Sequence, residues 1–150
     1  MQNGNINKIW NILGSVPDPE IPVISVVELG VIRDVKLIEN QYVISVTPTY
    51  SGCPAVKTFQ DDIKTQLKVN DIHNFKIDIV YKPAWTTEWM TQETKEKLKK
   101  YGISPPGKTV QCPQCDSTNI ELISEFGATA CKSMHKCVEC LEPFEHFKCI

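Results

Sequence analysis

The sequence predicts an α+β protein with two parts, a small domain in which helices pack on a sheet and a short β-rich module held together by cysteines. Upstream of residue 103, segments with the apolar spacing of helices alternate with β-branched runs typical of strands. This order predicts helices layered on one sheet. Downstream, every cysteine of the chain except Cys53 lies within residues 112–149. A module of that size rarely folds without a metal or disulfides, so we expect these cysteines to stabilise it.

The first elements of the small domain are expected to be a helix and a β-hairpin. The helix is predicted by apolar residues that recur at helical spacing, namely Ile6, Ile9, Trp10 and Leu13. The proline-rich segment 15–22 cannot continue it. Residues 31–38 and 42–47 are rich in β-branched side chains, and the polar residues 39–41 between them predict a hairpin.

A second helix, a third strand and a third helix follow. Pro54 suits the first position of a helix, because its missing N–H would have no helical partner. The apolar face of this helix is expected to carry Val56, Phe59, Ile63 and Leu67. Residues 75–81 alternate between apolar and charged side chains, which predicts a half-buried strand. The last helix is expected from Glu88 to Tyr101, closed by Gly102.

The chain is expected to divide at a short linker. Residues 105–109 contain two prolines and a glycine, which end the preceding helix and stiffen the connection. We therefore expect a first domain over residues 1–104 and a ribbon over residues 110–150.

The ribbon carries two Cys-x-x-Cys motifs, the spacing of a four-thiolate metal site. The expected ligands are Cys112, Cys115, Cys137 and Cys140. Four protein ligands close a tetrahedral site, so the spacing favours a structural Zn2+ over a reaction centre. Iron in a rubredoxin-like site and disulfides remain alternatives.

Composition and charge narrow the class of protein. The N-terminal residues contain no apolar run of the kind that a signal peptide needs, so we expect a cytoplasmic protein with reduced thiols. No apolar run approaches the length of a membrane span. A net charge of -2 disfavours nucleic acid as a partner, because binding to phosphates needs a basic surface.

Cys53 is the candidate reactive residue of the first domain. It lies just before the predicted second helix, where the helix dipole would stabilise a thiolate. A nucleophile or a metal ligand is one interpretation, and a packed thiol is the other. Asp18 and Glu20 could add oxygen ligands, although a proline-rich loop with acidic residues is more often a turn.

Other polar and aromatic residues have simple structural explanations. Cys131 and Cys149 are expected to be packed or idle thiols, with a second labile metal as the alternative. His135 and His146 could ligate a metal but are expected on the surface. The three tryptophans are expected in the core or at an interface with a partner protein.

Three motifs resemble those of a known family. The segments 18–22 (Asp-Pro-Glu-Ile-Pro) and 27–32 (Val-Glu-Leu-Gly-Val-Ile), followed by Thr47 and the Cys53-Pro54 pair, are similar to the SufT-like assembly-factor family of iron-sulfur cluster maturation. The resemblance spans residues 5–101 and implies the assembly-factor fold. It also implies that Cys53 acts as a thiolate or transient metal ligand, with Asp18 and Thr47 as lesser candidates.

Further motifs narrow the resemblance. With residues 83–89, 101–106 and 140–150, the chain resembles the D subunits of bacterial phenylacetyl-coenzyme A ring epoxidase systems. This implies an accessory role in phenylacetate catabolism, in which an iron or iron-sulfur centre of the oxygenase or reductase subunits is assembled or delivered. The implied partners are the subunits of that complex, and the oligomeric state, including a homo-oligomer, stays open.

We expect no catalytic activity from the chain itself. It has neither the Glu-x-x-His motif of di-iron oxygenases nor a Gly-x-Gly-x-x-Gly dinucleotide fingerprint. Two other functions remain as alternatives: a docking adaptor for which Cys53 is dispensable, and a rubredoxin-like electron carrier with iron in the ribbon.

Overall fold

The computed structural model describes residues 2–50 and 55–148. The chain divides into two compact units, Met1–Trp85 and Thr86–Ile150. This division lies upstream of the expected linker at residues 105–109. The reason is that α3 (Gln92–Tyr101) leads directly into β4 (Ile103–Ser104), and β4 pairs with β7 (Pro143–Phe147) of the second unit.

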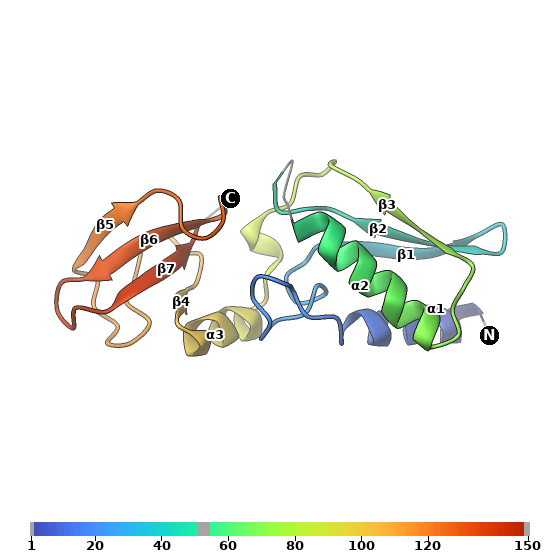
Figure 1. Cartoon of the computed structure of the whole chain (residues 1–150), viewed down its shortest axis with the longest axis horizontal. Coiled ribbons are helices and arrows are strands. Elements are labelled where there is room, and N and C mark those ends of the chain that lie inside the picture. Colours follow the sequence, from blue (N-terminus) through green and yellow to red (C-terminus); the bar gives the residue numbers. More distant parts are fainter. Residues whose placement is uncertain (1, 51–54, 149–150) are drawn as a thin grey trace. The chain divides into compact units, whose positions relative to one another are not determined.

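The first unit contains two helices and a three-stranded sheet in the predicted order, and the third predicted helix lies in the second unit. Its elements are α1 (Gln2–Leu13), β1 (Ile32–Ile38), β2 (Gln41–Val46), α2 (Ala55–Val69) and β3 (Phe75–Ile79). The strand order is β1-β2-β3, with β1 antiparallel and β3 parallel to β2. Because parallel neighbours need a crossover, α2 runs back between β2 and β3. Figure 1 shows α2 crossing one face of the sheet with α1 alongside it.

The β1–β2 hairpin turns on two residues with left-handed backbone. Glu39 has a φ of 49° and Asn40 a φ of 64°, which is the pattern of the primed turns that suit twisted strands. Ile38 therefore pairs with Gln41, and β2 begins one residue earlier than expected.

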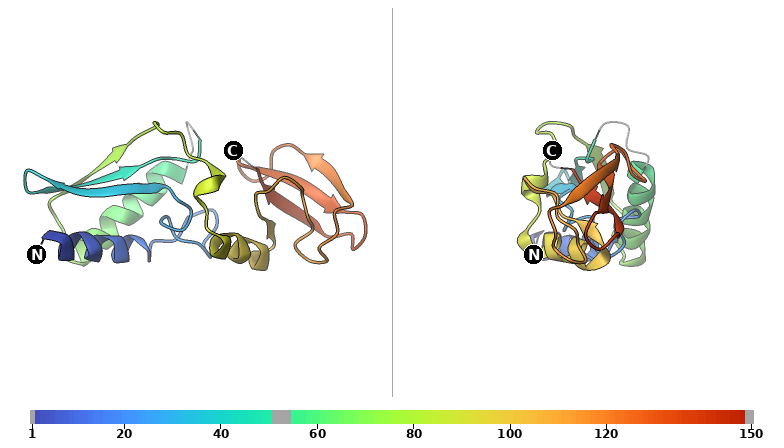
Figure 2. Two further views of the ribbon diagram at one scale, coloured as in Figure 1. Left: turned by 180° about the vertical axis from the view of Figure 1, so that it is seen from behind. Right: turned by 90° about the vertical axis from the view of Figure 1, so that its left-hand side faces the viewer.

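The core of the first unit lies between α2 and the sheet. The left view of Figure 2 shows the molecule from behind, with β1 and β2 in front of α2. The buried residues of α2 are Ala55, Phe59, Ile63 and Leu67. Val56 is only half-buried, so its predicted place on the apolar face is taken by Ala55, which lies one turn before Phe59. On β2, the buried residues are Val43, Ile44 and Val46.

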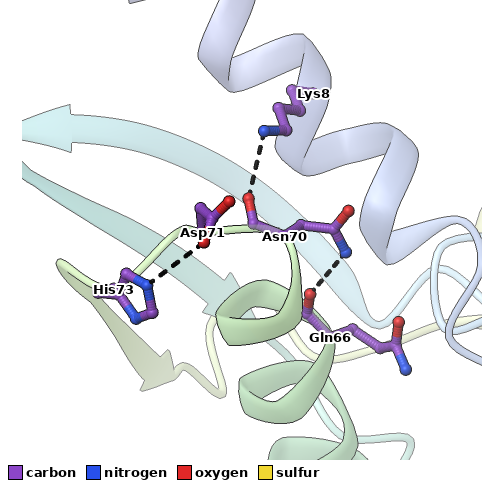
Figure 3. Close-up of polar contacts among 5 residues, drawn as sticks. All are labelled: Lys8, Gln66, Asn70, Asp71 and His73. Carbon is purple, nitrogen blue, oxygen red and sulfur yellow. Dashed lines mark hydrogen bonds and ion pairs between the residues drawn. The ribbon is translucent and has the colours of Figure 1, made fainter.

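Polar contacts join α1 to the end of α2. The Lys8 ammonium donates to the backbone carbonyl of Asn70 at 3.2 Å (Figure 3). The side chain of Asn70 donates to the Gln66 carbonyl at 2.8 Å, which satisfies an acceptor in the last turn of α2. Asp71 and His73 then face each other at 4.0 Å in the connection to β3.

The second unit is a four-stranded sheet preceded by a helix. Its further elements are a short 3-10 helix (Thr87–Trp89), β5 (Ile120–Ser124) and β6 (Lys132–Cys137). The strand order is β4-β7-β6-β5, with β6 antiparallel to both neighbours and β4 parallel to β7. This is the β-rich ribbon that the sequence predicts.

The predicted start of the third helix at Glu88 is wrong. Met90 has extended backbone, and Thr91 caps α3 by accepting a hydrogen bond from the Thr94 N–H at 3.2 Å. The end is as predicted, because Gly102 adopts a φ of 98° that glycine tolerates without strain. None of the helices in the described part of the chain has the length and apolar character needed to cross a lipid bilayer.

Candidate metal centre

The four predicted cysteine ligands meet in the second unit. Their sulfur atoms all lie within 4.8 Å of one another. The Sγ atoms of Cys112 and Cys140 are 3.6 Å apart, and those of Cys115 and Cys137 are 3.5 Å apart. Each close pair therefore joins one Cys-x-x-Cys motif to the other. All four thiols are free, and the first cysteine of each motif is buried while the second is exposed.

The first motif forms a tight turn around its buried cysteine. The Asp116 N–H donates to the Cys112 carbonyl at 3.0 Å, and the Cys112 N–H donates to the Ser117 carbonyl at 2.9 Å. Asp116 has a φ of 63°, which brings the chain back toward its start. The Gln114 N–H points at the Cys112 sulfur at 3.4 Å.

The second motif repeats this turn. The Leu141 N–H donates to the Cys137 carbonyl at 3.0 Å, and the Cys137 N–H donates to the Glu142 carbonyl at 2.9 Å. Leu141 has a φ of 67°, although left-handed backbone is unfavourable for leucine. The Cys140 N–H points at the Cys137 sulfur at 3.4 Å. Two equivalent turns thus present two sulfurs each, with backbone N–H groups positioned to stabilise negative charge on the buried sulfurs.

The sulfur positions fit a tetrahedral zinc ion. Zn–S bonds of about 2.3 Å in a tetrahedron place the sulfurs about 3.8 Å apart. The close pairs at 3.5 and 3.6 Å approach this spacing with the reduced thiols already in place. Soft thiolate donors in a set of four suit Zn2+ or iron and leave no position for substrate.

The acidity of the thiols depends on these contacts. The backbone N–H of Cys140 lowers the pKa of Cys137 to about 7, although burial acts in the opposite direction. Despite the Glu142 N–H, which acts to lower it, burial and the neighbouring sulfurs raise the pKa of Cys140 to about 12. Four thiolates at this spacing would repel one another, so a divalent cation is needed for all four to be ionised near neutral pH.

The hydrophobic cluster at the sulfurs is small. Its buried members are Cys112, Cys137 and Phe144, with Val110 and Ile120 packed against them. Two of its three buried members are therefore predicted metal ligands. A cluster of this size contributes little burial free energy by itself, which agrees with a module that depends on its metal.

Sequence reasoning placed His135 and His146 on the surface, and this is wrong. Their exposed fractions are only 8% and 5%. The Nε2 atom of His135 lies 2.7 Å from the Ser133 hydroxyl, and the Nδ1 atom of His146 lies 3.2 Å from the Ser104 hydroxyl. Burial lowers the pKa of both histidines, and for His146 burial together with the nearby His135 lowers it to about 4. A signal was present, because alternation along a strand places His135 on the same face as buried Cys137.

The candidate residues of the first unit are partly described. Cys53 lies outside the described residues, as does Cys149. Asp18 is buried, and its Oδ1 atom accepts hydrogen bonds from the backbone N–H groups of Glu20 and Ile21, both at 2.9 Å. Asp18 thus stabilises the turn of the proline-rich loop, as the structural interpretation of this loop predicts.

Thr47 follows β2 and is 1% exposed. Its backbone N–H donates to the Val31 carbonyl at 2.8 Å, and the Val31 N–H donates to the Val26 carbonyl. The side-chain hydroxyl is buried and has no hydrogen-bond partner among the described residues. A buried polar atom without a partner is unfavourable, which makes this hydroxyl the unusual feature of the region.

The remaining candidates pack into the structure. Cys131 is buried, and its sulfur lies 3.0 Å from the Thr129 hydroxyl, outside the four-cysteine cluster. Trp85 is 2% exposed, and its indole N–H donates to the Leu29 carbonyl at 3.0 Å. Trp85 is therefore a core residue of the first unit.

The two parts of the chain match two family models. Residues 6–73 match the model described as iron-sulfur cluster assembly protein, and residues 99–148 match the PaaD zinc beta ribbon domain. The second match covers all four cysteines of the cluster.

Relatives and solved structures agree with these matches. The chain is 44% identical over 97% of its length to an Escherichia coli protein named as the D subunit of a "Putative 1,2-phenylacetyl-CoA epoxidase", and it covers 93% of that protein. It is 33% identical to an Fe-S protein maturation auxiliary factor of Porphyromonas gingivalis, over 60% of this chain and 87% of the relative. A domain of unknown function DUF59 from Bacillus anthracis superposes with a TM-score of 0.59 at 33% identity, over 65% of this chain and 93% of that one.

The similarity to the Escherichia coli protein extends along both units of this chain, and so it includes the assembly domain and the ribbon together. The chain belongs to the family of phenylacetyl-CoA epoxidase D subunits, and it joins an iron-sulfur assembly domain to a zinc beta ribbon.

Proposed function

We propose that this protein matures the metal centre of a phenylacetyl-CoA epoxidase by assembling or delivering its iron or iron-sulfur cofactor. The observation that carries the proposal is the union, in one chain, of an assembly-factor domain and a ribbon that together match an epoxidase subunit along its length. The cargo metal is the substrate of this protein, and the epoxidase is the partner that receives it. We place the reaction in the cytoplasm, where thiols stay reduced.

In this proposal the ribbon has a structural role and does not bind the cargo metal. Zinc held by Cys112, Cys115, Cys137 and Cys140 supplies folding free energy to the second unit. A set of four thiolates leaves no open coordination position, so cargo has no ligand to gain there. The ribbon then keeps its fold while cargo is bound and released elsewhere.

Cargo is handled in the first unit. Cys53 is proposed as the thiolate that takes a transient bond to iron or to a cluster, because thiolates are the preferred protein ligands of both. The buried hydroxyl of Thr47, six residues earlier, supports this location, since a polar atom kept without a partner among the described residues needs a functional explanation. Asp18 is proposed to hold the neighbouring loop in shape through its bonds to two backbone N–H groups.

The test is co-expression of the epoxidase subunits with wild-type chain, with Cys53→Ala and with Cys131→Ala. Iron per epoxidase, zinc per chain and turnover of phenylacetyl-CoA are measured for each. We expect Cys53→Ala to keep its zinc and its fold while the epoxidase emerges deficient in iron and inactive. Cys131→Ala is the matched control, because it also removes one thiol outside the four-cysteine cluster.

Each alternative function gives a different result. Full iron and full turnover with Cys53→Ala would refute maturation and favour a docking adaptor. An electron carrier would hold ferric iron in the ribbon and absorb visible light, whereas a zinc ribbon is colourless. Elemental analysis of the purified chain therefore distinguishes an electron carrier, which would contain iron, from a protein with a zinc ribbon.

A further inference from the structure

The outer edge of the ribbon carries an unusual run of exposed apolar side chains. On and after β5, Leu122 is 53% exposed, Ile123 55% and Phe126 62%. Val138 of the second cysteine turn is 47% exposed, and its N–H donates to the Asn119 carbonyl at the start of β5. Exposed apolar residues therefore follow β5 from one end to the other. Large apolar side chains left exposed in one part of a fold are typical of interaction sites.

The backbone of β5 is also available for pairing. β5 is the edge strand of its sheet, and among the described residues it pairs with β6 alone. The Asn119 carbonyl bonds to the Val138 N–H, so Asn119 faces β6. In an antiparallel ladder the direction alternates, which turns the N–H and C=O groups of Ile120 and Leu122 outward. An outward row of such groups is a template for an added strand.

The charges beside this edge are mostly negative. Glu121, Glu125 and Glu139 are exposed, and the Glu139 carboxylate accepts a bond from the Asn119 side chain at 3.3 Å, which holds it at the start of β5. Two lysines lie close to these residues: Lys136 is exposed and is the cross-strand neighbour of Glu121, and Lys148 lies over the Phe126 ring at 4.3 Å. With three exposed carboxylates and two lysines, the charge beside β5 stays negative and favours a basic partner strand.

These charges indicate which kind of partner strand can pair with β5. A second copy of this chain would bring the same carboxylates together, which is unfavourable. A strand with Lys or Arg side chains would neutralise them, and its apolar side chains would cover Leu122 and Ile123. Edge carboxylates and the register shift between Leu122 and Ser124 also guard against aggregation, so they restrict pairing to a complementary strand.

We propose that β5 is the docking edge of this protein, and that it accepts an extended, basic strand of a partner epoxidase subunit as a fifth strand of the ribbon sheet. This inference rests on the proposed function for the identity of the partner. Main-chain bonds from Ile120 and Leu122 give affinity, and the carboxylates of Glu121 and Glu125 give selectivity.

The first experiment measures amide hydrogen exchange of the full zinc-loaded chain, alone and with the purified epoxidase subunits. We expect exchange at Ile120 and Leu122 to slow by about tenfold or more in the complex, because strand pairing protects outward amides. Binding affinity is then compared for wild type, for the double variant Leu122→Glu with Ile123→Glu, and for Val69→Glu. Val69 is the matched control, an apolar side chain 72% exposed on α2 of the first unit.

The double variant is expected to weaken binding by about tenfold or more, while Val69→Glu leaves it unchanged. Reversal of charge by Glu121→Lys with Glu125→Lys should weaken binding and abolish its salt dependence. If the subunits bind the wild-type chain without protecting β5, the docking edge is refuted and the proposed function stands. If no subunit binds, both are overturned. A dimer of the free chain that Leu122→Glu dissolves would also refute the proposal in favour of a second copy.

Discussion

Replacing the buried, predicted metal ligand Cys137 by serine is expected to unfold the ribbon while the first unit stays folded. Cys137 has no exposed surface, and its sulfur lies 3.5 Å from that of Cys115. Serine is similar in size, so the change removes a thiolate without emptying much space. The expected loss is therefore that of the metal and not of packing.

The magnitudes favour the metal as the main source of stability at the cysteine turns. Structural zinc contributes about 10 to 16 kcal/mol near neutral pH. The buried residue at the site that is not a ligand is Phe144, with Val110 and Ile120 partly buried beside it. Full burial of one such side chain contributes about 1.5 to 3 kcal/mol, so the three together supply roughly 5 kcal/mol. Apolar burial here cannot replace the ion.

The assay combines zinc analysis with a two-dimensional NMR spectrum of the whole chain. Wild type should hold one zinc per chain, and Cys137→Ser should lose zinc and collapse the resonances of β5 to β7 into the unfolded region. Resonances of α2 and β2 should persist, because Phe59, Ile63 and Ile44 form a core within the first unit. Cys131→Ser is the control, since it is an equally conservative change outside the cluster.

Two results would contradict this reasoning. If Cys137→Ser lost zinc but kept a dispersed ribbon spectrum, the ribbon would be stable without metal, and the estimate of its burial free energy would be too small. If Cys131→Ser also lost zinc, the ligand assignment would be wrong.

Three further predictions concern buried polar groups. Thr47→Val should leave the free energy of unfolding unchanged or raise it by about 1 kcal/mol, because it removes a buried hydroxyl that has no partner among the described residues. A clear loss of stability in a urea titration would contradict this. The same variant should still lower iron incorporation into the epoxidase. Asp18→Ala should cost about 1 to 3 kcal/mol, since two backbone N–H groups lose their acceptor, and a neutral outcome would show that the loop does not need it. The pKa of His146 is about 4 in the folded chain and 6.5 ordinarily, so protonation of this histidine favours the unfolded chain. The stability of the ribbon should therefore fall by about 1 to 2 kcal/mol as the pH drops from 6.5 to 4, after allowance for solvent screening. Melting curves of His146→Gln should show a flatter pH dependence than those of the wild-type chain.

The sequence predicted features that depend on local spacing. A Cys-x-x-Cys turn places two sulfurs side by side whatever surrounds it, so the gathering of four thiols was predictable and is confirmed. Helical spacing likewise predicted Phe59, Ile63 and Leu67 as the buried face of α2. The left-handed backbone at Leu141 was not predictable, because nothing in leucine favours it and the turn as a whole imposes it.

Features that depend on tertiary context were missed. His146 is buried because Ser104 and Ser133 pair opposite it on neighbouring strands, and no local pattern places β4 beside β7. The start of α3 was missed because Thr87–Trp89 form a separate 3-10 helix, and the extended backbone of Met90 divides it from α3, which begins after the Thr91 cap. Ala55 was overlooked since a small side chain gives a weak apolar signal.

The buried polar atoms without a partner bear on where cargo is handled. In the second unit, hydrogen bonds and the predicted ion engage every sulfur of the cluster, although the buried Nδ1 atom of His135 has no partner among the described residues. In the first unit, Thr47 keeps a buried hydroxyl without a partner among the described residues, which works against stability by about 1 to 3 kcal/mol. A fold retains such a group where function requires it, since a valine of the same shape would be more stable. Because Thr47 lies six residues before the candidate thiol Cys53, we infer that cargo is handled in the region after β2. The ribbon then serves this region by folding around its own metal and presenting β5 to a partner.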